Sequence, residues 1–192
     1  MKRAVMLGIA TVGCLALIGP PAQAQTSKFA GISGGATYGD LSGGVTNTRS
    51  RWGGMGGVFV GYRNWYTIGV LEANWVQKGG DSTRIDYIEV PFLIGGGTTT
   101  DAGILFRLYT GIGIGFPISC NSTSGSTLQN CDQKKSPEWT WPIGLLFGRQ
   151  FGNGPTFGAL DARYSIGLSD AFNNSQASNR SWQFRLMIGR MF

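Results

Sequence analysis

The chain has 192 residues, with 16 Lys and Arg against 10 Asp and Glu and no histidine. This length suits a single domain, and the modest positive charge does not by itself indicate a nucleic-acid partner. Glycine occurs 32 times, aromatic residues make up 12% of the chain and charged residues only 14%, a composition that favours strands over helices.

The first segment has the layout of a secretory signal peptide. Two basic residues precede an apolar run at 4–18, and an A-x-A cleavage motif follows at 22–24. The run is shorter than the ~20 apolar residues that a membrane-spanning helix needs. Lipid attachment at Cys14 is disfavoured because the apolar run continues past the cysteine. We therefore expect 1–24 to be a cleaved signal peptide and 25–192 to form one domain.

The remaining chain divides into segments in which apolar and polar residues alternate, the pattern of half-buried strands. These predicted strands lie at 27–38, 51–62, 66–77, 84–95, 103–116, 139–150, 156–167 and 181–192. Three connections are short and turn-like: 63–65, 96–102 and 152–155. The others are mostly longer and more polar: 40–50, 78–83, 117–138 and 169–180. This alternation predicts an all-β fold, an eight-stranded antiparallel up-and-down barrel.

The two faces of the later segments differ in an unusual way. In 181–192 the apolar face carries Trp182, Phe184, Leu186, Ile188 and Phe192. A soluble barrel would turn this face inward and need an evenly hydrophilic outer face, but the opposite face has few charges and many glycines. The pattern instead predicts a transmembrane β-barrel, with apolar residues toward lipid and polar residues toward the lumen. The segments 27–38 and 51–62 are too rich in glycine for their faces to be assigned.

An eight-stranded barrel is narrow enough for side chains to fill its lumen. The predicted inward charges are balanced, three of each sign: Glu72, Glu89, Arg107, Asp161, Arg163 and Arg185. Buried charges are tolerated only when they are paired, so we expect a salt-bridge network that plugs the lumen. The glycines of 111–115 would leave space for long neighbouring side chains. A phosphate-binding loop is disfavoured, because the third glycine and a following helix are missing.

Aromatic residues near the segment ends are expected to form interfacial girdles. They are Trp52, Trp65, Trp75, Trp139, Trp182, Phe151 and Phe192.

Two cysteines remain after the predicted cleavage, Cys120 and Cys131, within a polar stretch. In an exported protein this pair predicts a disulfide. A metal site is disfavoured because histidine is absent and no other cysteine remains. The absence of histidine also argues against an enzyme that uses a histidine base, so we expect no catalytic residues, no metal and no cofactor.

Two stretches resemble a known family. The run NWVQKGGDSTRIDYIEVPFLI at 74–94 resembles the hairpin of PorT-like outer-membrane barrels, and ARYSIGLSDAF at 162–172 resembles that family's penultimate strand. Phe192 resembles the terminal signal read by the outer-membrane assembly machinery, which the resemblance implies as a partner during biogenesis. Some members of the family are associated with gliding or protein secretion.

The sequence as a whole predicts a protein of the outer membrane of a Gram-negative cell, with a structural or interaction role. The segments 117–138 and 169–180 are the best candidates for binding an unknown protein partner. Membrane lipid and lipopolysaccharide are the other expected partners, the latter through basic residues near the outer rim: Arg49, Arg51, Lys78, Arg84, Lys134, Lys135 and Arg180. A solvated rim is the plainer interpretation, because acidic residues such as Glu138 lie there too. A narrow channel for small solutes and an accessory barrel of a secretion or envelope machinery remain alternatives.

Overall fold

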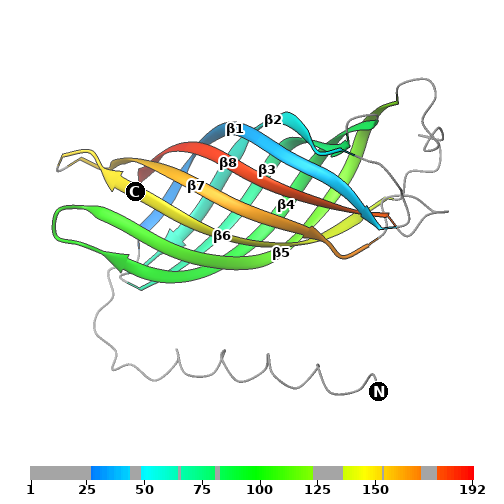
Figure 1. Ribbon diagram of the computed structural model, residues 1–192. Coiled ribbons are helices and arrows are strands. Elements are labelled where there is room, and N and C mark those ends of the chain that lie inside the picture. Colours follow the sequence, from blue (N-terminus) through cyan, green and yellow to red (C-terminus); the bar gives the residue numbers. More distant parts are fainter. Residues whose placement is uncertain are drawn as a thin grey trace, which may run out of the picture.

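Antiparallel strands, each paired with the next along the chain, close into a barrel (Figure 1). The computed structural model describes residues 27–43, 49–64, 66–80, 83–122, 136–152, 154–169 and 177–192. The strands are β1 (Ser27–Gly43), β2 (Arg51–Arg63), β3 (Thr67–Gly80), β4 (Thr83–Thr99), β5 (Ile104–Ser122), β6 (Glu138–Gln150), β7 (Thr156–Gly167) and β8 (Ala177–Met191). Because β1 pairs with both β2 and β8, the sheet has no open edge. The predicted eight-stranded antiparallel barrel is confirmed. None of the described segments is a helix long and apolar enough to cross a membrane.

The barrel has two different ends. At one end, which we call the turn end, lie the connections 64–66, 100–103 and 151–155. The backbone of Phe192 also exchanges hydrogen bonds with Lys28 there, so the last residue closes the ladder between β8 and β1. The opposite end, which we call the loop end, carries the connections 44–50, 81–82, 123–137 and 168–176.

Several strands extend further toward the loop end than the sequence predicted. The predicted connection at 78–83 is wrong: β3 continues to Gly80 and β4 begins at Thr83, with Lys78 paired opposite Ile85. Likewise, β5 continues to Ser122 and β8 begins at Ala177. Hydrophobic alternation fades in these stretches because most of their residues are polar or glycine, but the backbone ladder does not depend on apolar side chains and continues past that point.

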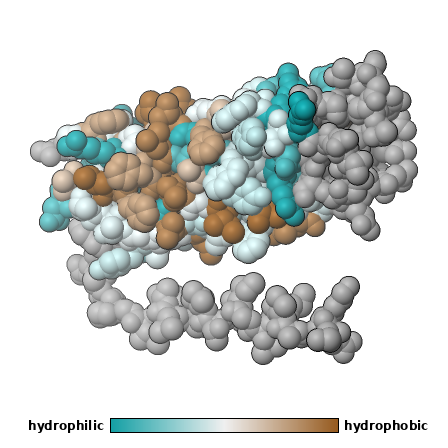
Figure 2. Space-filling view, viewed as in Figure 1, coloured by the Kyte–Doolittle hydropathy of each residue, from teal (hydrophilic) through white to brown (hydrophobic). Residues whose placement is uncertain are grey.

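Large apolar side chains gather on the outside of the barrel, where Figure 2 shows brown patches over the middle of the wall. On β8, Trp182, Phe184 and Leu186 are exposed whereas Gln183 and Arg185 are buried, as the alternation predicted. The described members of the predicted aromatic girdle are all exposed: Trp52, Trp75, Trp139, Phe151, Trp182 and Phe192.

The facing of β1 and β2, which their glycines left open, is now clear. Phe29, Ser33 and Thr37 of β1 are buried in the lumen, as are Met55 and Phe59 of β2. The outer face of the same strands carries exposed apolar side chains: Ile32, Val58 and Val60.

The lumen near the turn end is apolar, a feature that the sequence pattern did not predict. Three aromatic rings form its centre: Phe29 lies 6.1 Å from Phe59 and 5.8 Å from Phe157 between ring centroids, and the second of these pairs meets edge to face. Around them pack other buried apolar residues, Val70, Leu93, Leu105, Leu146, Ala159 and Met187. Strands β1 to β8 therefore enclose a small hydrophobic core, which closes this end of the barrel.

Candidate functional site

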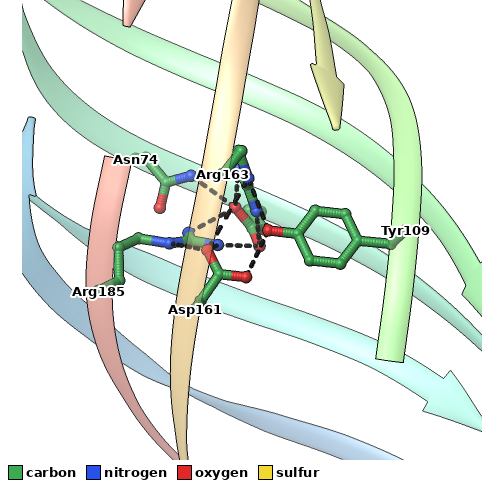
Figure 3. A network of polar contacts seen from close by, with 6 residues as sticks. Asn74, Tyr109, Asp161, Arg163 and Arg185 are labelled. Carbon is green, nitrogen blue, oxygen red and sulfur yellow. Dashed lines mark hydrogen bonds and ion pairs between the residues drawn. The ribbon is translucent and has the colours of Figure 1, made fainter. Parts of the chain in front are cut away.

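Next to this apolar core, a network of charged side chains crosses the lumen (Figure 3). Its members come from four strands: Glu72 and Asn74 from β3, Tyr109 from β5, Asp161 and Arg163 from β7, and Arg185 from β8. All six side chains are buried. We call this set the lumen network.

Glu72 is the centre of the lumen network, because both arginines bind its carboxylate. Arg163 donates from Nη1 to Oε2 and from Nη2 to Oε1, each at 3.0 Å. Arg185 donates from Nη1 to Oε2 at 2.8 Å and from Nη2 to Oε1 at 3.2 Å. Asn74 adds a further hydrogen bond to Oε2 at 2.8 Å. Such two-pronged guanidinium–carboxylate pairs are stronger and more directional than single contacts.

Asp161 provides the second carboxylate of the network. Arg185 donates to its Oδ1 from Nε at 2.9 Å and from Nη2 at 2.8 Å. The Tyr109 hydroxyl donates to Oδ2 of Asp161 and accepts a hydrogen bond of 3.0 Å from Nε of Arg163. Tyr109 thus links Asp161 to Arg163, whose guanidinium also lies 5.2 Å from the centre of the tyrosine ring.

Local sequence explains how these large side chains fit together. Residues two apart on a strand share a face, so Asp161 and Arg163 both point inward from β7. Gly144 of β6 leaves space for the tyrosine, because a Cβ at this position would lie 2.5 Å from Cζ of Tyr109. A Cβ at Gly57 would similarly overlap Asn74.

The lumen network is electrically balanced, with two arginines against two carboxylates. Removing such ions from water is expensive, and only close pairing offsets the cost. The void between the network and the apolar core is about 40 Å³ and is lined by Phe59, Val70, Tyr109 and Met187 among others. A space of this size holds a few water molecules at most. The described side chains therefore fill the lumen at this level rather than lining an open pore.

The six predicted inward charges are all buried, but they do not form one network. Glu72, Asp161, Arg163 and Arg185 come together as described. Arg107 lies apart, nearer the turn end, where it donates to the carbonyl of Phe106 at 3.0 Å and to Oγ1 of Thr99 at 2.7 Å.

Glu89 belongs to a second polar cluster nearer the loop end, where it forms an ion pair with Lys78. The Lys78 ammonium also lies 5.5 Å from the ring centre of Tyr87. In the same cluster, Nδ2 of Asn179 donates to Oε2 of Glu138 at 2.9 Å and to the Tyr87 hydroxyl at 3.0 Å. We call these five residues the outer cluster.

The outer cluster corrects two sequence-based assignments. Lys78 and Glu138 were both expected at the solvated rim, but they are only 4% and 0% exposed. The misplacement follows from the strand ends, because β3 and β6 include these residues while the predicted strands stopped just short of them. The alternation itself held the signal: Lys78 has the same parity as Glu72, and Glu138 the same parity as the inward residue Thr140.

Other predicted sites lie partly outside the described residues. Cys120 is on β5, but Cys131 is outside, so their disulfide stays a prediction. The signal peptide at 1–24, Trp65, Lys134, Lys135 and most of the predicted binding loops are outside too. Phe192 is 75% exposed at the turn end. This exposure does not test its role in assembly, which stays a prediction. Within the described ranges, no three His, Cys, Asp or Glu residues are grouped so that they could hold a metal ion.

A closed eight-stranded barrel with an apolar outer belt and a charged lumen has the form of the small transmembrane β-barrels. Neisserial surface protein A (NspA) has a similar crystal structure, with a TM-score of 0.51 and 15% identity over 87% of this chain and 99% of that one.

Two further solved structures are similar at lower scores. Ail, the attachment invasion locus protein of Yersinia pestis, has a TM-score of 0.44 and 12% identity over 84% of this chain and 97% of its own. The outer membrane protein AlkL, in lipid bilayers, has a TM-score of 0.46 and 11% identity over 91% and 94%. At these identities, the similarity to NspA shows the fold alone. No family model and no curated protein matches the sequence, so the resemblance to PorT-like barrels stays a prediction.

Proposed function

We propose that this protein is an integral barrel of the bacterial outer membrane whose lumen is closed and whose role is structural or an interaction made at the loop end. In this orientation, the turn end faces the periplasm and the loop end faces the outside, because barrels of this class have short periplasmic turns and longer external loops. The proposal includes no catalysis and no cofactor.

The observation that carries the membrane location is the inverted placement of apolar and charged side chains. Along β8, Phe184 and Leu186 are 45% and 66% exposed, while Arg185 between them is 2% exposed. In water this arrangement would be unfavourable, because it exposes the apolar side chains and buries the ion. In a bilayer the same arrangement is favourable, since the lipid covers the apolar belt and the closed sheet has no open edge of unpaired backbone groups.

Strand length supports a role at the loop end. A bilayer-spanning strand needs about 9–11 residues, and β1, β4 and β5 are longer, with 17, 17 and 19 residues. On β1 and β5 the extra residues lie at the loop end, where these strands run to Gly43 and Ser122. The barrel wall would therefore project from the membrane there and carry the 117–138 and 169–180 segments outward. We propose that these segments meet a protein partner or lipopolysaccharide, with Arg49, Arg51, Arg84 and Arg180 near the same rim.

A channel is the weaker alternative. Conduction needs a continuous aqueous path, but the lumen network joins β3 to β7 and β8 through paired arginines, and the apolar core packs against it. A closed barrel is also compatible with an accessory role within a larger envelope machinery. The identity of the protein partner would distinguish this role from a structural role or a separate interaction at the loop end.

Reconstitution tests the proposal directly. The 25–192 polypeptide is refolded with and without lipid vesicles, and folding is followed by heat-dependent migration in gel electrophoresis. We expect folding only with lipid or detergent, protection of the strands from protease, and no steady single-channel openings in planar bilayers. A folded monomer in plain buffer would refute the membrane location, and reproducible openings would refute the closed lumen.

A further inference from the structure

Three basic side chains point outward from the barrel at the turn end. Arg149 continues the outward series of β6 after Phe147, and Arg190 continues that of β8 after Ile188. Lys28 occupies the matching outward position at the start of β1. All three are exposed. They lie where the apolar belt ends, so positively charged side chains directly border the belt at this end.

Strand register places these three cations on one arc of the rim. Arg190 pairs opposite Ala30 of β1 and opposite Thr156 of β7, and Lys28 is two residues from Ala30. Gly158 of β7 pairs opposite Arg149. The arc therefore runs over the neighbouring strands β1, β8, β7 and β6, and we call it the basic arc.

The basic arc has no acidic partner in the described part of the chain, where none of its three cations forms an ion pair. The one acidic side chain of the described turn end is Asp101, in the connection between β4 and β5. The terminal carboxylate of Phe192 also lies there, where it accepts a hydrogen bond of 3.2 Å from the backbone amide of Lys28. The positive charge left for a ligand from outside the chain is therefore mainly that of Arg149 and Arg190.

The rest of the same rim is different in kind. At the turn end of β2 the outward position carries the exposed ring of Tyr62, while Arg63 lines the lumen void. The ring of Tyr66, in the connection to β3, is exposed too. The basic arc is therefore confined to one side of the barrel, which a general need for charged residues at a membrane surface does not explain.

Its neighbours identify the depth at which the basic arc lies. Phe151 and Phe192 are 58% and 75% exposed beside it, and exposed aromatics at strand ends are typical of the membrane–water interface. Long basic side chains at this level extend their charged groups to the lipid headgroups. Arginine binds phosphate through two parallel hydrogen bonds, and each cation near an anionic surface contributes about 1 kcal/mol.

We propose that the basic arc of Lys28, Arg149 and Arg190 binds the phosphate of an anionic glycerophospholipid in the leaflet at the turn end. The inference rests on the proposed membrane location and names the lipid class that this face selects. Lipopolysaccharide phosphates offer similar chemistry, but in the proposed orientation they lie at the opposite end of the barrel.

The test measures the lipid that remains bound to the protein. The 25–192 chain is refolded in vesicles of equal phosphatidylglycerol and phosphatidylcholine, extracted in mild detergent, and its retained lipids are quantified by mass spectrometry. We expect enrichment of phosphatidylglycerol, falling at least about fivefold in the R149Q/R190Q variant. The charge-preserving R149K/R190K variant is expected to keep most of the enrichment.

Matched cations at the loop end serve as the control. Arg49 and Arg180 are also exposed, and lipopolysaccharide, the lipid proposed for their end of the barrel, is absent from these vesicles, so R49Q/R180Q makes the same change in charge without touching the basic arc. We expect it to retain lipid as the unmodified protein does. No enrichment in the unmodified protein, or an equal loss in both double variants, would overturn the proposal. The proposal would also be overturned if, with lipid A added, R149Q/R190Q lost bound lipid A but kept its bound phosphatidylglycerol. A chain that never inserts into vesicles would instead refute the membrane location itself.

Discussion

Glu72 and Arg163 lie on strands β3 and β7 and meet across the lumen through two hydrogen bonds of 3.0 Å each. The pair joins residues that are 91 positions apart in the chain, and both side chains are buried. This ion pair connects opposite walls of the barrel. Because Arg185 binds the same carboxylate, this one glutamate compensates two buried cations.

Replacing Glu72 with glutamine should therefore be strongly destabilising. The E72Q variant keeps the size of the side chain but leaves Arg163 and Arg185 with one carboxylate between them. Breaking a buried pair on one side typically costs about 3–5 kcal/mol. Equilibrium urea unfolding in lipid vesicles measures the loss. The control is the D101N variant at an exposed position, which should leave the free energy of unfolding unchanged. Similar free energies of unfolding for both variants would contradict a stabilising role of the Glu72–Arg163 pair.

The space that Gly144 leaves for Tyr109 gives a second prediction. The added methyl of G144A would overlap the tyrosine ring and push its hydroxyl away from Asp161 and Arg163. Overpacking of this kind costs about 1–3 kcal/mol. The matched control is Gly56→Ala on β2, where a Cβ would meet only the Ser33 carbonyl at an ordinary 3.6 Å. The melting temperature should fall in the first variant and stay constant in the second.

Two adjacent residues of β2 test the apolar core. Phe59 is 2% exposed within the core and Val60 is 52% exposed on the outer face. The F59A variant should lose about 3–5 kcal/mol, because it opens a cavity that its neighbours cannot fill. The V60A variant should lose much less, since lipid replaces the missing methyl groups. Urea unfolding in vesicles ranks the two, and the opposite order would mean that the facing of β2 is reversed.

The outer cluster gives a prediction about Lys78. The K78M variant would leave Glu89 and Glu138 as buried carboxylates without their cation, and we expect a loss of about 3 kcal/mol or more. Adding Glu89→Gln should restore part of the stability, because it removes one uncompensated charge. This recovery is measured as the coupling in a double-mutant cycle.

Arg84 offers the control for that cycle. It pairs with Asp86 at 2.9 Å but remains accessible to solvent, and exposed pairs contribute little. The R84M variant should therefore unfold almost as the unmodified protein does. If K78M were equally harmless, Lys78 would belong at the solvated rim after all.

Much of the barrel can be predicted from alternation alone. The facing of β5, β6, β7 and β8 follows from a period of two, since large apolar residues and small or charged residues separate cleanly there. In β1 and β2 glycine weakens this signal, and the inward Phe29 and Phe59 could not be distinguished from outward aromatics. The inward positions of Lys78 and Glu138 were missed for a related reason. Both lie at the polar ends of β3 and β6, where the alternation of hydropathy ends before the strand does.

By itself, the amino-acid sequence determined the fold class, the number of strands and the inward position of the six charged residues in the middle of the strands, because those properties depend on local periodicity. Only the tertiary structure decided the partners. Glu72 meets Arg163 and Arg185, rather than Arg107, because closing the barrel sets the register between strands distant in sequence. That closure also divides the lumen into an apolar core, the lumen network and the outer cluster. Inward side chains from different strands can contact one another only where the register places them at the same level along the barrel axis.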